Sequence, residues 1–184
     1  QSPTTIVTVG HVANAMGLST QVWKPLNIKD GTDGKLISAR IQRWVGGGAE
    51  KLVVLELQAA FPAARSVAIR TAPLAPEDRL VTLAYLNQDP RFVRGRFVQY
   101  GTEGKLAGTA LLEMYEGDNR LAIDHGASGA PVFDCEGRVA VVISNVIAQI
   151  FQTPFGVLRT STAWGSPNVV SVPVQQLMEF SEAE

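Results

Sequence analysis

The sequence predicts an all-β fold, either a sandwich or a pair of barrels, from three observations. Valine is abundant, with 21 copies in 184 residues, and it occurs in short runs of the kind that favour strands. Turn signals containing glycine, proline, asparagine or aspartate separate nearly all of these runs. No long amphipathic segment alternates with them, as a βαβ protein would require.

The expected elements follow the chain from turn to turn. Strands are predicted at residues 5–9, 21–28, 35–45, 51–57, 67–69, 79–86, 92–99, 107–114, 131–133, 138–145 and 169–172. The C-terminal residues 173–182 place apolar side chains at helical spacing and predict about three turns of helix. A short helical turn is expected at residues 12–16.

Two halves are expected, divided at the polar, proline-containing turn over residues 87–91. Residues 1–87 form the first half and carry His11. Residues 88–184 form the second half and carry Ser128.

Composition and charge exclude several classes of function. A formal net charge of −1 and the lack of a dense Lys/Arg run give no electrostatic reason to bind nucleic acid. The most apolar stretch, residues 139–151, is interrupted by polar side chains and is shorter than the roughly 20 residues of a membrane-spanning helix. The single cysteine, Cys135, excludes an intramolecular disulfide and a multi-cysteine zinc site, and the two histidines lack the spacing of a metal pair. We expect no metal and no cofactor.

The sharpest local signal is the segment Asp-His-Gly-Ala-Ser-Gly-Ala-Pro-Val at residues 124–132. A serine between glycines in a tight turn exposes its hydroxyl, here that of Ser128. The glycines let the backbone N–H groups of Gly126 and Ser128 point at one spot, as an oxyanion hole requires. The alternative is a glycine-rich turn with an incidental serine.

A serine nucleophile needs a base, and the chain has two histidines. His125 lies three residues before Ser128 in the same turn and is expected to point outward. His11 follows the β-branched run Ile-Val-Thr-Val-Gly, where a buried wall can hold an imidazole in one orientation. Taken alone, His11 would be a strand-end histidine bonded to a backbone carbonyl.

Together, these segments resemble the chymotrypsin-like serine peptidases, and most closely the disulfide-free bacterial Htr/Deg type. Residues 6–12 are similar to the family's apolar segment that ends in the catalytic histidine, and residues 126–132 are similar to its Gly-x-Ser-Gly-Gly-Pro segment. The similarity continues through residues 137–144 and ends at the apolar-Pro entry to the last helix at residues 170–173.

The resemblance implies two packed six-stranded antiparallel β-barrels with a C-terminal helix and a site between the barrels. It implies acyl transfer by Ser128, with His11 as base and then acid, and with the amides of Gly126 and Ser128 as the oxyanion hole. Only ten residues precede His11, so the first barrel is expected to be incomplete at its N-terminus. The family's usual location, periplasmic or secreted, is a further implication.

Two positions depart from the family pattern. The third triad member is an aspartate opening a strand, and here Lys51 aligns with it. Either Glu50 supplies the carboxylate after a one-residue slip, or the site is a Ser–His dyad, or the protein has lost activity. Ala130 replaces the second glycine of the serine motif.

Alignment puts the floor of the primary specificity pocket near Ala122, with Ser144, Asn145 and Val146 along one wall. No acid lies at this floor to pair with a basic side chain, and Val146 narrows the pocket. A small apolar residue before the cut is therefore expected.

The expected activity is that of a serine endopeptidase with a polypeptide substrate. The alternative is a catalytically impaired pseudo-peptidase that uses the same fold to bind a protein ligand. An α/β-hydrolase is excluded on two grounds. Ala130 stands where that family's Gly-x-Ser-x-Gly motif has its last glycine, and Pro131 with a predicted strand follows where the family has a helix.

Overall fold

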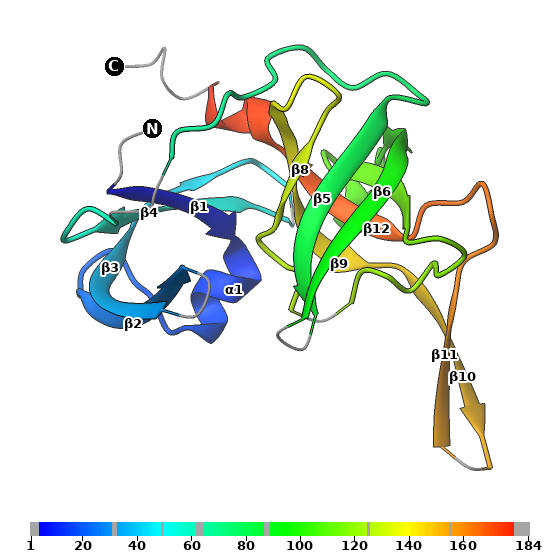
Figure 1. Cartoon of the computed structure of the whole chain (residues 1–184), viewed down its shortest axis with the longest axis horizontal. Coiled ribbons are helices and arrows are strands. Elements are labelled where there is room, and N and C mark those ends of the chain that lie inside the picture. The colour runs from blue at the N-terminus through cyan, green and yellow to red at the C-terminus, as the bar shows by residue number, and fades with distance from the viewer. Residues whose placement is uncertain are drawn as a thin grey trace.

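The computed structural model describes residues 4–30, 33–48, 50–61, 65–86, 89–124, 126–154 and 156–178. The expected all-β architecture is confirmed. An open sheet from the N-terminal part of the chain lies beside a closed six-stranded barrel (Figure 1). No helix in these ranges is both long and apolar enough to cross a membrane.

The N-terminal sheet has four strands in the order β1-β4-β3-β2. These are β1 (Thr5–Val9), β4 (Leu52–Leu57), β3 (Asp33–Val45) and β2 (Lys24–Asp30), all antiparallel to their neighbours. The pairing of β1 with β4 runs from Thr5 opposite Glu56 to Val9 opposite Leu52. It therefore brings the residues just after β1 next to the residues just before β4. Helix α1 (Gly10–Ala15) begins directly where β1 ends.

The closed barrel has the strand order β12-β7-β6-β5-β8-β9. Its strands are β5 (Arg79–Leu86), β6 (Asp89–Tyr100), β7 (Ala110–Tyr115), β8 (Pro131–Phe133), β9 (Val139–Val146) and β12 (Val169–Pro173). Phe97, Leu112 and Met114 are fully buried inside it. Two short 3₁₀ helices, η1 (Gly104–Leu106) and η2 (Val174–Leu177), flank the barrel strands in sequence.

Strand β9 is buried on both faces, which explains its nearly continuous run of apolar residues. Val141 and Ile143 belong to the barrel core. Val139 and Val142 belong to a second apolar cluster, called here the seam, which joins the barrel to the N-terminal sheet. Its buried members are Val9, Val45, Leu52 and Val54 from the sheet and Val139, Val142, Val172, Val174 and Leu177 from the C-terminal part. The two units are thus held together by buried apolar surface.

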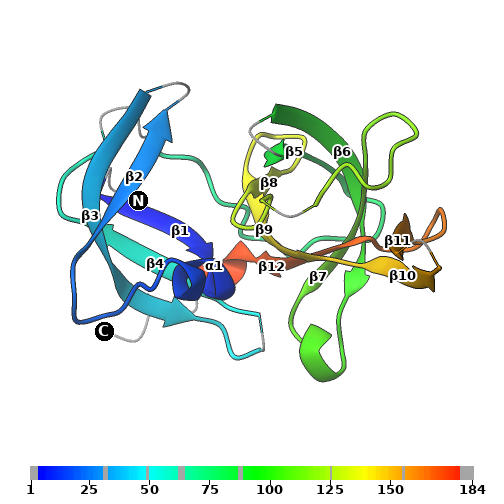
Figure 2. The same ribbon diagram turned by 90° about the horizontal axis from the view of Figure 1, so that it is seen from below.

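A two-stranded hairpin, β10 (Ala148–Thr153) and β11 (Gly156–Ser161), projects away from the barrel (Figures 1 and 2). It interrupts the connection between β9 and β12. The sequence patterns did not predict it.

The described structure differs from the other expectations in specific places. The six-stranded expectation holds for the second unit, whereas the first is a four-stranded sheet in the part of the chain that the structure describes. The expected strand at residues 67–69 is only a single bridge between Ile69 and Val139. The expected C-terminal helix is the short η2, and residues 179–184 lie outside the described ranges.

The connection between the two units also differs from the expected one. The division at residues 87–88 falls between β5 and β6, which pair with each other in the barrel. The chain therefore passes from sheet to barrel between Leu57 and Arg79.

Candidate active site

A cavity of about 750 Å³ opens where the N-terminal sheet meets the barrel. Its lining comes from both units: Gly10, His11, Asn14, Trp44, Glu50 and Lys51 from the first, and Ser128, Ser144 and Asn145 from the second. Three residues that the sequence singled out therefore line one cavity. Relative to His11, Glu50 lies 39 residues and Ser128 lies 117 residues further along the chain.

The first wall is built on the junction of β1 and β4. The Gly10 N–H donates to the Lys51 carbonyl at 2.9 Å, which ties the start of α1 to the residue before β4. The Trp44 ring packs against Gly10, where an added Cβ would lie 2.9 Å from it. His11 is the second residue of α1 and is exposed to the cavity. The helical turn thus starts one residue before His11, whereas the sequence placed it after.

The second wall is the turn that carries Ser128. Its backbone is fixed on both sides: the Gly129 N–H donates to the Ile143 carbonyl at 2.8 Å, and the Ile143 N–H donates to the Ala130 carbonyl at 2.9 Å. Ala127 is buried in the barrel core, which anchors the residue just before the serine. Gly129 has φ +92°, a conformation that favours glycine. Ala130 is accommodated in this turn without displacing these bonds.

Hydrogen bonds connect the serine wall to the glutamate through Ser144. The Ser128 hydroxyl donates to the Ser144 carbonyl at 2.9 Å. The Ser144 hydroxyl in turn donates to the Glu50 carboxylate. Ser144 is only 1% exposed, so the carboxylate of Glu50 has a buried, fixed partner at the edge of the cavity. Lys51, the residue aligned with the family's aspartate, lines the same cavity.

Two backbone donors beside Ser128 remain available. Among the described residues, the N–H groups of Gly126 and Ser128 make no hydrogen bond. Gly126 has φ +100°, so its peptide adopts an orientation that side-chain-bearing residues rarely allow. Within the same described ranges, His11 bonds neither Ser128 nor Glu50. His125, the other histidine, lies outside them.

The residues assigned to the specificity pocket are distributed over two environments. Ala122 is fully buried in the barrel core. Ser144 and Asn145 line the cavity, whereas Val146 is half-buried and packs against the barrel core. The Asn145 side chain accepts the Val146 backbone N–H through Oδ1 at 2.9 Å.

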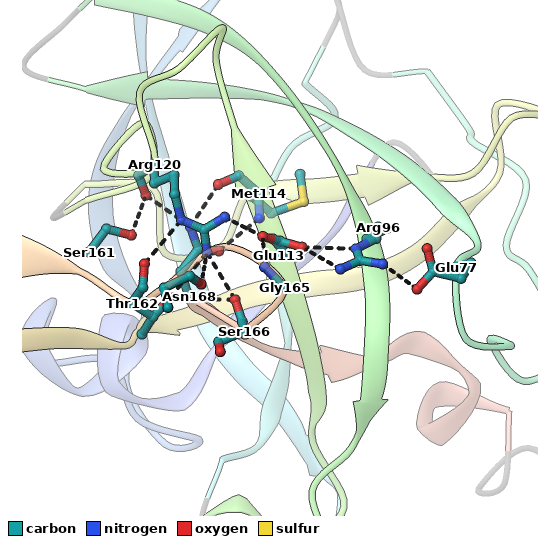
Figure 3. A network of polar contacts seen from close by, with 11 residues as sticks. Glu77, Arg96, Glu113, Met114, Arg120, Ser161, Thr162, Gly165, Ser166 and Asn168 are labelled. Atoms are coloured by element: carbon teal, nitrogen blue, oxygen red, sulfur yellow. Dashed lines mark hydrogen bonds and ion pairs between the residues drawn. The ribbon is translucent and has the colours of Figure 1, made fainter.

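A buried ion network lies outside the cavity and fixes the loop over residues 162–168 (Figure 3). Glu113 is 3% exposed and accepts hydrogen bonds from Arg120, from Arg96 at 2.8 Å and from the Gly165 N–H at 2.8 Å. Arg120 also donates to the carbonyls of Thr162, Ala163 and Ser166 and lies 4.4 Å from the ring centre of Trp164. Burial alone raises the pKa of the Glu113 carboxyl, but the donors from Arg120, Gly165 and Arg96 outweigh burial and hold this pKa below its ordinary value.

Sequence reasoning missed two cavity residues, Asn14 and Trp44. Asn14 lies three residues after His11 in α1, a spacing that puts both side chains on one helical face, so a confident helix assignment would have found it. Trp44 carries no such signal, because its ring reaches the cavity only through the pairing of β3 with β4. No group of three or more His, Cys, Asp or Glu side chains suited to a metal ion occurs in the described ranges.

The comparisons with known proteins agree with this fold. The family model for the trypsin-like peptidase domain matches residues 1–142. The inactive form of the Rv3671c protease superposes with a TM-score of 0.61 at 12% identity, covering 99% of this chain and 79% of that one. The inactive Ser343Ala mutant of Rv3671c from M. tuberculosis H37Rv gives 0.58 at 11% identity, covering 99% and 76%. At such identities these two structures support the fold alone. No curated protein matches the sequence.

Proposed function

Because the chain belongs to the trypsin-like peptidase family, we propose that it is a serine endopeptidase whose nucleophile is Ser128 and whose base is His11. The observation that carries the proposal is the cavity between the two units, which His11 and Ser128 both line, together with the backbone N–H groups of Gly126 and Ser128, which have no partner among the described residues. A nucleophile and a base on one cavity, with a pair of free backbone donors next to the nucleophile in the chain, are the parts that acyl transfer needs.

In the proposed reaction, Ser128 Oγ attacks the carbonyl carbon of the scissile peptide bond while His11 takes the hydroxyl proton. The N–H groups of Gly126 and Ser128 hold the resulting oxyanion. His11 then gives its proton to the leaving amine, and water releases the acyl group by the same steps in reverse. A rotation about the Cα–Cβ bond of Ser128 exchanges its present acceptor, the Ser144 carbonyl, for the imidazole.

We assign Glu50 as the carboxylate that orients His11 and stabilises the imidazolium. The support is its position on the cavity and its bond from the buried Ser144 hydroxyl, which leaves the carboxylate other lone pairs to offer. Lys51 contributes its backbone carbonyl to the start of α1, a role that does not depend on its side chain. Specificity for a small apolar residue before the cut remains part of the proposal.

The rival function is a binding module that no longer cuts. It is favoured by one observation: in the described ranges His11 bonds neither Ser128 nor a carboxylate, while the serine proton rests on a backbone carbonyl. A binder of polypeptides needs the cavity but does not need an activated serine.

The two functions are separated by labelling with a fluorophosphonate probe and mapping the adduct by mass spectrometry. The peptidase is expected to label at Ser128, to lose the label in Ser128→Ala and to lose most of it in His11→Ala. Ser38→Ala, which removes a β3 hydroxyl outside the cavity, is the matched control and should label normally. Well-folded protein that takes no label would contradict the peptidase and leave the binding module.

A second experiment tests the third residue and the specificity. Glu50→Gln is expected to lower turnover on the order of 10⁴-fold, by analogy with loss of the carboxylate from a triad. Lys51→Gln should have a much smaller effect. Digestion of a peptide mixture should give cuts after small apolar residues, and cuts after lysine or arginine would overturn the pocket assignment.

A further inference from the structure

The β10–β11 hairpin exposes apolar side chains on both of its faces. Phe151 pairs directly with Leu158, and their side chains are 49% and 52% exposed. Ile150 and Val157 lie on the opposite face and are 71% and 67% exposed. Figures 1 and 2 both show the hairpin projecting from the barrel, and none of the described helices or strands lies over it.

Such a hairpin has little reason to be stable by itself. An isolated two-stranded ribbon is marginal in water. Among the described strands, β10 pairs only with β11, so its other side is an open strand edge. Exposed apolar side chains combined with an open edge are the features that strand addition by a peptide uses.

The root of the hairpin is nevertheless held rigidly. Arg120, fixed by Glu113, donates to the Thr162 carbonyl, and the Ser161 hydroxyl at the end of β11 donates to the Arg120 carbonyl at 3.4 Å (Figure 3). On the other strand, the Ile147 N–H donates to the Asn168 carbonyl at 2.8 Å. The hairpin is therefore presented in a set direction from the barrel.

That direction continues the edge beside Ser128. Strand β9 pairs with β12 on one side, and on its other side β8 and the residues just before it, Gly129 and Ala130, cover the stretch up to Ile143. Beyond that point the open side of β9 is the side on which the Ser128 hydroxyl meets the Ser144 carbonyl. Only Ile147 separates β9 from β10, and β11 takes over from β12 as the partner on the same side. The open edge of β10 therefore prolongs the open edge at the cavity.

Two polar groups of that edge are occupied by local side chains. The Ser144 carbonyl accepts the Ser128 hydroxyl, and the Val146 N–H donates to the side chain of Asn145. Both caps are short, rotatable groups that a peptide backbone can replace without any movement of the strand.

We propose that the hairpin binds, as an added antiparallel strand, the apolar stretch of a polypeptide substrate that precedes the bond to be cut. The inference rests on the proposed function. A substrate strand with its reactive carbonyl at Ser128 and antiparallel to β9 runs with its preceding residues past Val146 and along β10. The six residues of β10 match a segment about 20 Å long. The substrate class is thus an extended, apolar chain segment, as in an unfolded protein.

Binding is measured on the Ser128→Ala protein, so that no peptide is consumed. Three fluorescein-labelled peptides are compared by anisotropy: a short core, the same core with about six alternating Val and Thr residues added before it, and the core with the same residues added after it. The extension before the core should tighten Kd at least about tenfold, and the extension after it should have little effect.

Two double variants locate the gain. Ile150→Thr with Val157→Thr, and Phe151→Thr with Leu158→Thr, keep strand propensity but remove one apolar face each, and each should reduce the gain from the extension severalfold. Leu36→Thr, an equally exposed apolar residue on β3, is the matched control and should leave the gain intact.

Equal gains from both extensions, or a gain that survives in both double variants, would overturn the proposal. Sedimentation velocity gives a separate refutation: a dimer that the hairpin variants dissociate would make a second copy of the chain the occupant. Because binding is measured without Ser128, failure of the hairpin is distinguishable from failure of the peptidase, which the fluorophosphonate label reports.

Discussion

Neutralising Glu113 should destabilise the fold strongly, because it leaves the guanidinium of Arg120 buried without its countercharge. Glu113→Gln keeps the shape of the side chain but removes its charge and replaces one of its two acceptor oxygens with an NH2 group. The side chain of Arg120 is 6% exposed and that of Glu113 is 3% exposed, so water cannot replace the lost partner. Breaking such a buried pair costs about 3 to 5 kcal/mol in the free energy of unfolding. For a chain of this length the cost corresponds to a Tm lower by about 6 to 20 °C.

Urea unfolding followed by circular dichroism measures this loss. The matched control is Glu116→Gln, which breaks a pair with Arg91 whose side chains are 36% and 41% exposed, and which should cost less than about 1 kcal/mol. A loss in Glu113→Gln no larger than in the control would refute the assignment of a buried, charge-dependent clamp.

The pH dependence supplies an independent check on the same residue. The pKa of the Glu113 carboxyl is lowered in the folded protein, so the unfolded chain binds the proton more tightly. The stabilisation is therefore present at pH values above the unfolded pKa and is lost as the pH falls through the folded pKa. The stability gap between wild type and Glu113→Gln should shrink on acidification, and a gap independent of pH would contradict the reasoning.

Three further predictions concern the site and the core. Ser144→Ala should lower turnover by about ten- to a hundredfold, because the hydroxyl that holds the Glu50 carboxylate is lost. A turnover of casein equal to that of the wild type, measured on folded protein, would contradict that role. Gly129→Ala should lower the Tm more than Gly137→Ala does. Both glycines have positive φ, but only at Gly129 would the new Cβ lie 2.8 Å from a threonine hydroxyl of β1. Phe97→Ala should cost about 3 to 5 kcal/mol in urea unfolding, since the ring is 1% exposed inside the barrel, and a loss under about 1 kcal/mol would mean that the barrel collapses around the gap.

The strands that sequence predicted best are those with local signals at both ends. Residues 5–9, 79–86 and 131–133 form β1, β5 and β8 with the predicted bounds. Each is a run of strand-forming residues next to a turn residue or a proline, and each has at least one buried apolar side chain. For such segments, local propensity and tertiary pairing agree.

The hairpin and the C-terminus show where local patterns fail. β10 has the burial pattern of a strand exposed on both faces, so it lacks the alternation that marks a half-buried strand. Of the residues with helical spacing after Pro173, only the four of η2 form a helix in the described ranges. Val174 and Leu177 belong to the seam, and packing there decides the conformation.

Much of the candidate site could be predicted, because its two motifs are local. His11 and Ser128 lie on the same cavity, as the motifs implied. The choice between Glu50 and Lys51 could not be made from sequence, since both residues precede the first paired residue of β4. In the structure, Glu50 accepts a hydrogen bond from Ser144, and the Lys51 carbonyl accepts one from the first N–H of α1. Both contacts join segments that are far apart in the chain.

The seam has a consequence for how the cavity keeps its shape. Val9 lies two residues before His11, Leu52 lies two residues after Glu50, and Val142 lies two residues before Ser144. Each wall of the cavity is thus the immediate continuation of a buried apolar anchor, and these anchors contact one another across the two units. Hydrophobic packing therefore contributes to the alignment of the site together with its polar contacts. Truncating a side chain of the seam is therefore expected to change how the two walls of the cavity lie against each other.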